Sequence, residues 1–210
     1  MDRRFFLAGT GAALATPAIA APTARRVFQI LRDGDDIGRH TMIAVQGING
    51  FTLDTEIDIK VTFLGVTAYR YLLKNREIWK AGQLVSMNAT TNDDGTEDAA
   101  RVRAGSKALR IEGSRLTGEA PLNAVTTSYF ATPFLKRRPW ISTQSGKPLK
   151  IDVTAEGRRN WWSVSGELNT RLGYDQRGEW VGCEFDAGGE PGRYEMIGEA
   201  GRIGELWSQA

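Results

Sequence analysis

The strict alternation of apolar and polar residues in TLDTEIDIKVTF, residues 52–63, is the feature that most constrains the fold. Its apolar members, which share one parity, are Leu53, Ile57, Ile59, Val61 and Phe63. Successive side chains of a β-strand point to opposite faces, so a period of two over this length predicts one long strand with one dry face. One wet face favours antiparallel pairing, because parallel sheets are usually covered on both sides.

The same alternation returns in WWSVSGELNTRLGY, residues 161–174, and in EWVGCEF, residues 179–185. Pairs such as Asp33-Gly34 and Asp94-Gly95 separate the alternating segments, and glycine supplies the positive φ that tight hairpin turns need. Neighbouring strands joined by short turns pair as a meander. The strands predicted in this way cover residues 27–32, 37–46, 51–63, 66–79, 84–91, 97–104, 107–112, 149–154, 160–174, 179–186 and 193–198.

These patterns predict an all-β fold. The antiparallel meander is expected to form a barrel or a strongly curved half-barrel, because twist accumulates over many long strands and open edges invite aggregation. One short helical connector interrupts the strands. We expect residues 21–210 to form a single β domain, since the second block of strands is too small to close a core alone.

The connector is the segment NAVTTSYFATPFLKRRPW, residues 123–140, which has no period of two. We expect a short helix over residues 124–130, capped by Asn123 and ended by Pro133. The connector is expected to lie across one end of the sheet. Its inward-facing aromatic residues would be Tyr129, Phe130, Phe134 and Trp140.

Residues 1–20 combine a positive front, an uncharged apolar middle and an Ala-x-Ala end, which is typical of a secretory signal peptide. Ala18 and Ala20 are the small residues before the predicted cleavage site. A stable membrane anchor is the alternative. The apolar run is shorter than the roughly 20 residues that cross a bilayer, so we expect no permanent anchor.

The pattern Arg-Arg-x-Phe-Leu near the start resembles the core of the twin-arginine export signal, with Arg3, Arg4, Phe6 and Leu7 as its members. Such a signal is an address read by a receptor. We therefore expect a periplasmic location and the twin-arginine export machinery as a partner, with the general secretory route as the alternative.

Composition excludes several classes of function. Removing the leader lowers the formal net charge from +2 to +1, so no net basic field attracts nucleic acid. Cys183 is the only cysteine, so no intrachain disulfide can form, and we expect it in the core. His40 is the only histidine and is expected to be partly exposed on a strand. The acidic residues near Asp94 do not fit a calcium loop, so we expect no metal and no cofactor.

The segment YRYLLKNREIW, residues 69–79, carries the candidate ligand site. The residues that share one parity are Tyr69, Tyr71, Asn75, Glu77 and Trp79. If the tyrosines face inward, Glu77 does too, and a buried carboxylate is costly unless it is paired or hydrogen-bonded. This pattern is typical of the polar end of an apolar pocket, with Arg39 or Arg101 as the partner of Glu77. The alternative is that the strand runs past the core and its far end meets water.

Three stretches carry a resemblance to a known family. They are NREIWKAGQLVSMNATTNDDGT, TTSYFATPFLKRRPWISTQSGK and YDQRGEWVGCEFDAGGE. They resemble an exported bacterial group that is number sixty-one thirty-four in the domain-of-unknown-function series, over nearly all of the mature chain. The resemblance implies a secreted, mainly β protein akin to lipocalin-like or half-barrel periplasmic proteins, and it implies no catalytic residues.

Together these features predict non-catalytic binding of a small apolar or amphipathic ligand inside a curved sheet. The first alternative is an interaction or structural module of the cell envelope that acts through its surface. The second alternative is an enzyme that uses Glu77 or His40, although no orienting carboxylate for His40 can be located in the sequence.

Overall fold

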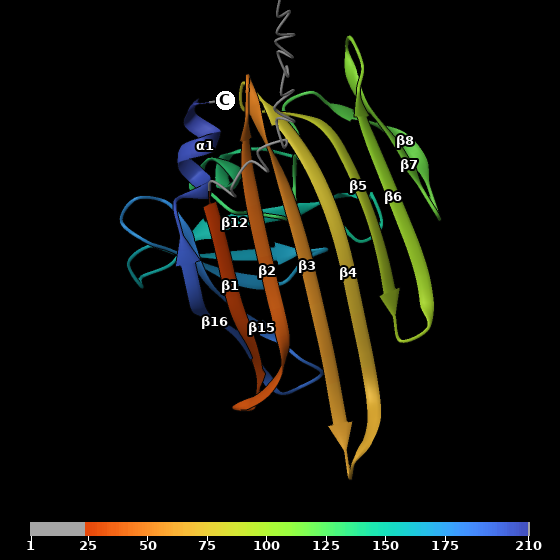
Figure 1. Cartoon of the computed structure of the whole chain (residues 1–210), viewed down its shortest axis with the longest axis vertical. Coiled ribbons are helices and arrows are strands. Elements are labelled where there is room, and N and C mark those ends of the chain that lie inside the picture. Colours follow the sequence, from red (N-terminus) through yellow and green to blue (C-terminus); the bar gives the residue numbers. More distant parts are fainter. Residues whose placement is uncertain (1–23, 210) are drawn as a thin grey trace, which may run out of the picture.

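The computed structural model describes residues 24–209, and its main element is a 13-stranded antiparallel sheet (Figure 1). The first half comprises β1 (Ala24–Arg32), β2 (Asp35–Gly47), β3 (Gly50–Phe63), β4 (Val66–Lys80), β5 (Gln83–Asp93), β6 (Thr96–Ala104), β7 (Ala108–Gly113) and β8 (Thr117–Pro121). The second half comprises β12 (Ile151–Ala155), β13 (Trp161–Gly166), β14 (Thr170–Tyr174), β15 (Trp180–Asp186) and β16 (Pro191–Ala200).

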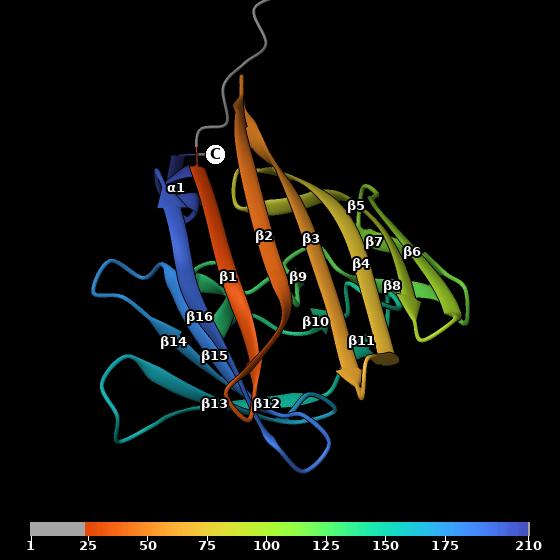
Figure 2. The same ribbon diagram turned by 60° about the horizontal axis from the view of Figure 1, so that its bottom comes forward.

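The sheet is a meander whose two halves join where β16 pairs with β1. Strands β12 and β8 are its edges and do not pair with each other, so the sheet is strongly curved but not closed. Figure 2 shows the two halves bending around a common interior. The predicted all-β half-barrel is therefore confirmed. Three details differ from the prediction. The strand expected over residues 160–174 is divided by a turn between Gly166 and Thr170, the one expected over residues 149–154 is divided between β11 (Pro148–Leu149) and β12, and β8 was not predicted.

Strand β3 shows why the alternation produces this fold. Its inward residue Leu53 is fully buried, whereas the next residue, Asp54, is partly exposed on the outer face. There the carboxylate of Asp54 pairs with Arg76 of β4 at 2.6 Å, and Asp58 pairs with Arg70 at 2.9 Å. The polar parity thus forms cross-strand ion pairs in water, and the apolar parity supplies one continuous dry face.

The connector fills the concave side of the sheet and does not lie across one end. It forms a three-stranded sheet of β9 (Val125–Thr126), β10 (Trp140–Ile141) and β11 (Pro148–Leu149), with a 3-10 helix, η1 (Thr132–Lys136), between β9 and β10. In Figure 2 these short strands lie inside the curve of the large sheet. The expected inward packing is observed for three aromatic residues, which are nearly or fully buried: Phe130, Phe134 and Trp140.

The helix expected over residues 124–130 is wrong. Val125 and Thr126 instead pair in parallel with Trp140 and Ile141. Two β-branched residues favour this extended pairing over a helical turn. The helical turn follows at η1, where Pro133 lies near its start and not after its end. Proline suits the first turn of a helix, because the missing N–H has no partner there.

A short C-terminal helix, α1 (Ile203–Gln209), completes the core and was not expected from the sequence. Its Trp207 is 4.8 Å from the ring of Trp79 and 5.1 Å from the ring of Phe134. Buried Glu179, the residue before β15, holds this helix, since its carboxylate accepts a hydrogen bond from the backbone N–H of Gly204 at 2.8 Å and pairs with Arg26 of β1 at 3.3 Å. Among residues 24–209 no helix is long and apolar enough to cross a membrane.

Because the connector is part of the core, shortening one of its buried side chains should lower the stability of the fold. We expect Phe134→Ala to lower the free energy of unfolding by about 3–5 kcal/mol, the usual cost of removing a buried aromatic side chain. The control Ile197→Ala removes a side chain that is 52% exposed and should change stability by less than about 0.5 kcal/mol. Urea denaturation followed by tryptophan fluorescence measures both, and equal effects would show that the connector is peripheral.

Candidate functional site

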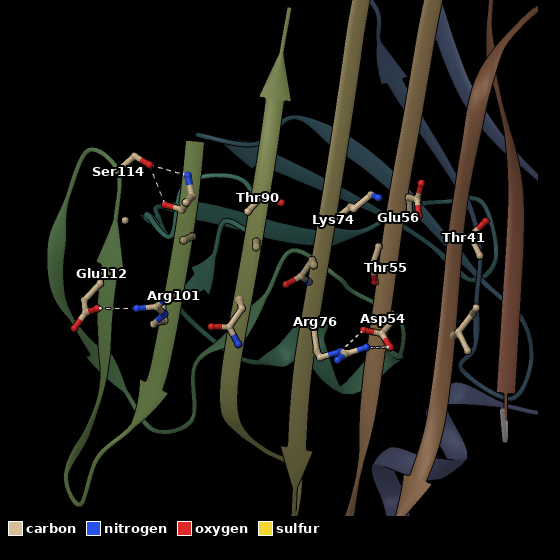
Figure 3. Close-up of a pocket in the computed structure, with 17 residues that line it drawn as sticks. Thr41, Asp54, Thr55, Glu56, Lys74, Arg76, Thr90, Arg101, Glu112 and Ser114 are labelled. Carbon is tan, nitrogen blue, oxygen red and sulfur yellow. Dashed lines mark hydrogen bonds and ion pairs between the residues drawn. The ribbon is translucent and has the colours of Figure 1, made fainter. Parts of the chain in front are cut away.

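One of several hollows lies on the outer face of the sheet and spans β2 to β7 (Figure 3). It measures about 780 Å³. Four of its six charged side chains form ion pairs, as Figure 3 shows for Arg76 with Asp54 and for Arg101 with Glu112. Solvated ion pairs on an outer sheet face stabilise little. The concave side of the sheet offers a more enclosed set of groups.

A second hollow, the concave pocket, measures about 430 Å³. It lies between the concave faces of β2, β3 and β4 on one side and the connector on the other, with β16 beside it. Residues that matter for its chemistry are His40, Thr55, Tyr71, Ser128, Tyr129 and Tyr194. Ile57, Leu73 and Leu168 add apolar surface, and the carboxyl groups of Asp93 and Glu167 also line the pocket. A concave site that combines apolar wall with placed polar groups is typical of ligand binding.

Tyr69 and Tyr71 line this pocket, as expected of inward-facing tyrosines. The hydroxyl of Tyr69 donates a hydrogen bond to Oδ1 of Asp93 at 2.8 Å. Burial is the main reason that the pKa of both phenols is raised, to about 12 for Tyr71. Both side chains are therefore neutral hydrogen-bonding groups and not anions at physiological pH.

His40 is the most unusual group in the pocket. It is 3% exposed, and neither ring nitrogen has a hydrogen-bond partner among residues 24–209. The expectation of a partly exposed strand histidine is therefore wrong. The aromatic residues Phe28, Trp180 and Tyr194 surround the imidazole, with ring centroids 5.3 to 5.9 Å away. Phe28 is opposite His40 on the neighbouring strand β1, whereas Trp180 and Tyr194 belong to β15 and β16, which lie far from His40 in the sequence.

Burial lowers the pKa of His40 to about 3. The ring is therefore neutral at physiological pH and offers one donor and one acceptor. Because unpartnered buried polar atoms are few in native proteins, each calls for an explanation. His40 has two such atoms in one ring, and both belong to a residue that lines a pocket.

Thr55 and Asn75 add to this group. They lie opposite each other on β3 and β4, and Oγ1 of Thr55 and Oδ1 of Asn75 have no partner among the described residues. Thr55 lines the concave pocket, and both Thr55 and Asn75 also line the hollow on the outer face. Leaving a buried donor or acceptor unsatisfied lowers the free energy of unfolding by roughly 1–3 kcal/mol. The stability of the fold therefore does not explain why these polar groups are present.

Glu77 contrasts with these residues, because its buried carboxylate is satisfied. Oε1 accepts hydrogen bonds from Ser128 at 2.6 Å and from Asn75 at 2.9 Å, and Oε2 accepts one from Trp79 at 2.7 Å. Burial raises the pKa of Glu77, and these hydrogen bonds oppose that rise. The carboxyl thus joins β4 to the connector through Ser128, which is a structural role.

The partners expected for Glu77 are wrong. Arg39 pairs with Asp36 at 2.7 Å, and Arg101 lies 3.9 Å from Glu112 on the outer face. The alternative that the far end of β4 meets water is also wrong, because Glu77 is fully buried. Neutral donors can replace a cation when a carboxylate receives several hydrogen bonds.

The residues expected to form the site therefore divide into two groups. Tyr69 and Tyr71 line the concave pocket, whereas Asn75, Glu77 and Trp79 lie deeper, behind Ser128. Sequence reasoning missed the residues that complete the pocket, which are His40, Thr55, Tyr129 and Tyr194. A signal for His40 exists, since it shares a parity with Met42 and Ala44, which are fully buried. The expected export and cleavage residues lie outside the described residues: Arg3, Arg4, Phe6, Leu7, Ala18 and Ala20.

Tyr129 holds the pocket wall in a strained conformation. Its φ is +28°, in the left-handed region that bulky residues avoid. The ring lies 5.0 Å from that of Trp180 and 6.1 Å from that of Trp140, so packing fixes it in place. Backbone strain of this kind persists only where the surrounding structure imposes it, and strained residues are found preferentially at binding and active sites.

The chemistry of catalysis has little support in this pocket. His40 has no hydrogen bond to a carboxylate, which a general base needs for orientation. Burial raises the pKa of the Cys183 thiol to about 12, so the thiolate that a nucleophile requires is disfavoured. Within the described part of the chain, no three or more His, Cys, Asp or Glu residues gather in a group that could hold a metal ion.

Comparison with known proteins adds a family and a fold. A family model described as Domain of unknown function (DUF6134) matches residues 28–197. No curated protein matches the chain. Among solved structures, the chain is similar to the crystal structure of a beta-barrel-like protein of domain of unknown function DUF1849 from Brucella abortus, with a TM-score of 0.53 and 8% identity over 87% of this chain and 99% of that chain. At this identity the likeness supports the fold alone.

The buried neutral histidine should make stability depend on pH. Below about pH 6.5 the unfolded chain protonates His40 but the folded protein does not, so stability falls as the pH falls toward 3. His40→Phe should abolish this contribution, which amounts to about 2 kcal/mol between pH 6.5 and pH 5. Urea denaturation of both proteins across this range gives the difference, in which other titrating groups cancel. Parallel stability curves would contradict a buried, unpartnered imidazole.

Proposed function

The chain belongs to the Domain of unknown function (DUF6134) family, and we propose that it binds a small amphipathic molecule in the concave pocket without transforming it. One observation carries the proposal. His40 is 3% exposed, lines the pocket and has two ring nitrogens without partners among residues 24–209. A ligand that forms hydrogen bonds with this ring would remove the free-energy cost of leaving its two nitrogen atoms unsatisfied.

The chemistry of the wall defines the ligand class. The neutral imidazole presents one donor and one acceptor, and the hydroxyl of Thr55 presents one of each. A ligand head group that both donates and accepts, such as a hydroxyl, an amide or a protonated carboxyl, matches them. Ile57, Leu73 and Leu168 provide an apolar wall for the rest of the molecule. At about 430 Å³ the pocket lies within the size range of small-molecule sites.

Binding without catalysis fits the groups in the pocket. Glu77, which could serve as an acid or base, is enclosed by Asn75, Ser128 and Trp79 and does not line the pocket. His40 has no carboxylate to orient it. The two carboxylates that line the pocket are already engaged, because Asp93 accepts a hydrogen bond from Tyr69 and Glu167 accepts hydrogen bonds from Lys147 and from the backbone N–H of Lys150. These contacts favour recognition over catalysis.

The proposed place of action is the periplasm. Support comes from the first residues of the chain, where Arg3 and Arg4 precede an uncharged apolar run that ends at Ala18 and Ala20. N-terminal sequencing of protein from a periplasmic extract tests this point. A mature chain that begins at Ala21 supports export, and an intact leader in cytoplasmic protein contradicts it.

Native mass spectrometry of protein purified from cells under non-denaturing conditions tests the binding proposal. A bound mass that is released on unfolding, and that rebinds to the refolded chain, identifies the ligand. A protein that is always free of ligand, and that does not bind extracted small molecules, would refute the proposal.

An isosteric substitution separates binding from folding. Thr55→Val removes a buried hydroxyl without a partner, so it should raise the free energy of unfolding by roughly 1 kcal/mol while weakening ligand binding. The matched control is Thr170→Val, whose hydroxyl contacts Cys183 Sγ and donates to the carbonyl of Glu184 outside the pocket. The control should lower stability and leave affinity unchanged. Ligand titration and urea denaturation measure both properties, and equal affinities in all three proteins would place the ligand elsewhere.

A further inference from the structure

The β3–β4 hairpin ends in an exposed apolar segment, residues 62–68, which we call the hairpin tip. The tip contains no charged residue in a chain in which 25% of residues are charged. Phe63 is 70% exposed, Leu64 is 88% exposed and Val66 is 68% exposed. Figure 1 shows that this hairpin extends beyond the neighbouring strands. An apolar group at such a projection contributes nothing to the core.

The turn at the tip places a bulky residue in a left-handed conformation. Leu64 and Gly65 have φ values of +50° and +81°. Three other turns have nearly the same conformation and carry smaller residues at the first position: Asp33-Gly34 (+48° and +90°), Ala81-Gly82 (+48° and +67°) and Asp94-Gly95 (+49° and +91°). Asp and Asn tolerate this left-handed position, whereas a bulky residue such as leucine avoids it. Local folding therefore disfavours leucine here, so its presence points to a role outside the folded chain.

Two cations lie directly behind the tip. Lys60 and Arg70 are opposite each other in the register of β3 and β4. They lie three and four residues from Phe63 and Val66, which corresponds to roughly 10 Å along a strand. This distance is close to the depth of about 5–10 Å to which apolar surfaces enter the boundary between head groups and acyl chains. Arg70 already pairs with Asp58, and four acidic residues line the hollow beside Lys60 and Phe63, so apolar contact is the larger contribution: Asp33, Asp35, Asp36 and Glu190.

The apolar row that faces the pocket continues to the tip. Thr55 is 6% exposed, Ile57 and Ile59 are partly buried pocket residues, and Phe63 of the same parity is largely exposed. The exposed fraction therefore rises from the interior of the concave pocket toward the tip. The hairpin tip is therefore at the solvent-exposed end of this row of β3 side chains.

We propose that the hairpin tip inserts into the surface of a lipid bilayer, with Lys60 and Arg70 at the level of the head groups. A fluid bilayer accepts a narrow, convex apolar projection, whereas a protein partner would need a matching groove. Three side chains supply on the order of a few hundred Å², which is less than the roughly 800 Å² per partner of a standard protein interface. A second copy of the chain is therefore a poorer match. This inference does not depend on a ligand in the concave pocket.

Flotation with vesicles tests the inference directly. The probes are vesicles of phosphatidylcholine alone and of phosphatidylcholine with phosphatidylglycerol, mixed with the full chain. We expect wild-type protein to float with both, and Leu64→Asn to reduce the partition coefficient at least tenfold. Asparagine suits the left-handed turn, so the thermal midpoint of this variant should not fall. Loss of binding then cannot be attributed to unfolding.

The matched control is Ile48→Asn. Ile48 is 99% exposed and lies in the β2–β3 turn, at the opposite end of β3 from the tip. This variant should bind vesicles like the wild type, and all three proteins share the same first 23 residues, so any contribution of that segment cancels. Equal flotation of Leu64→Asn and wild type, or binding that vanishes in 1 M salt, would overturn apolar insertion. A wild-type dimer in solution that Leu64→Asn dissociates would overturn it in favour of a second copy.

Discussion

The structure depends on one constraint. The inner face of this curved sheet is apolar and the sheet does not close, so other segments of the chain must cover that face. Strands β8 and β12 leave the sheet open, so hydrogen bonding between them cannot seal the interior. The chain instead places Phe130, Phe134 and Trp140 of its connector against the dry face, and the C-terminal helix adds Trp207. The concave pocket is the part of this interior that the connector borders without filling.

The treatment of buried polar groups separates structural from functional positions. Glu77 carries the group that is most expensive to bury, yet three hydrogen bonds satisfy it and attach the connector to β4. His40 and Thr55 lie in the same interior, and their polar atoms have no partner within residues 24–209. Apolar residues at these positions would avoid this cost, and the difference between the two kinds of buried group is the basis of the proposed binding site.

The sequence predicts what depends on local periodicity and misses what depends on distant neighbours. Alternation in residues 52–63 was sufficient to find the long strands, because one face meets water. The connector has no period, since each of its short strands pairs with only a few residues and Val125 pairs in parallel with Trp140. Parity indicated the inward side of His40, but its burial depends on Phe28, Trp180 and Tyr194 from other strands. The pocket could not be predicted for the same reason.

The pairing of β1 with β16 has a consequence for synthesis on the ribosome. The first and last strands are neighbours at the seam between the two halves of the sheet, and Arg26 donates a hydrogen bond to the carbonyl of Gly201, 175 residues away in the chain. Until the final segment emerges, β1 presents an unpaired edge to the cytosol. The sheet therefore cannot be completed before β16 has been synthesised, and this pairing is subject to the slow kinetics that long-range contacts impose.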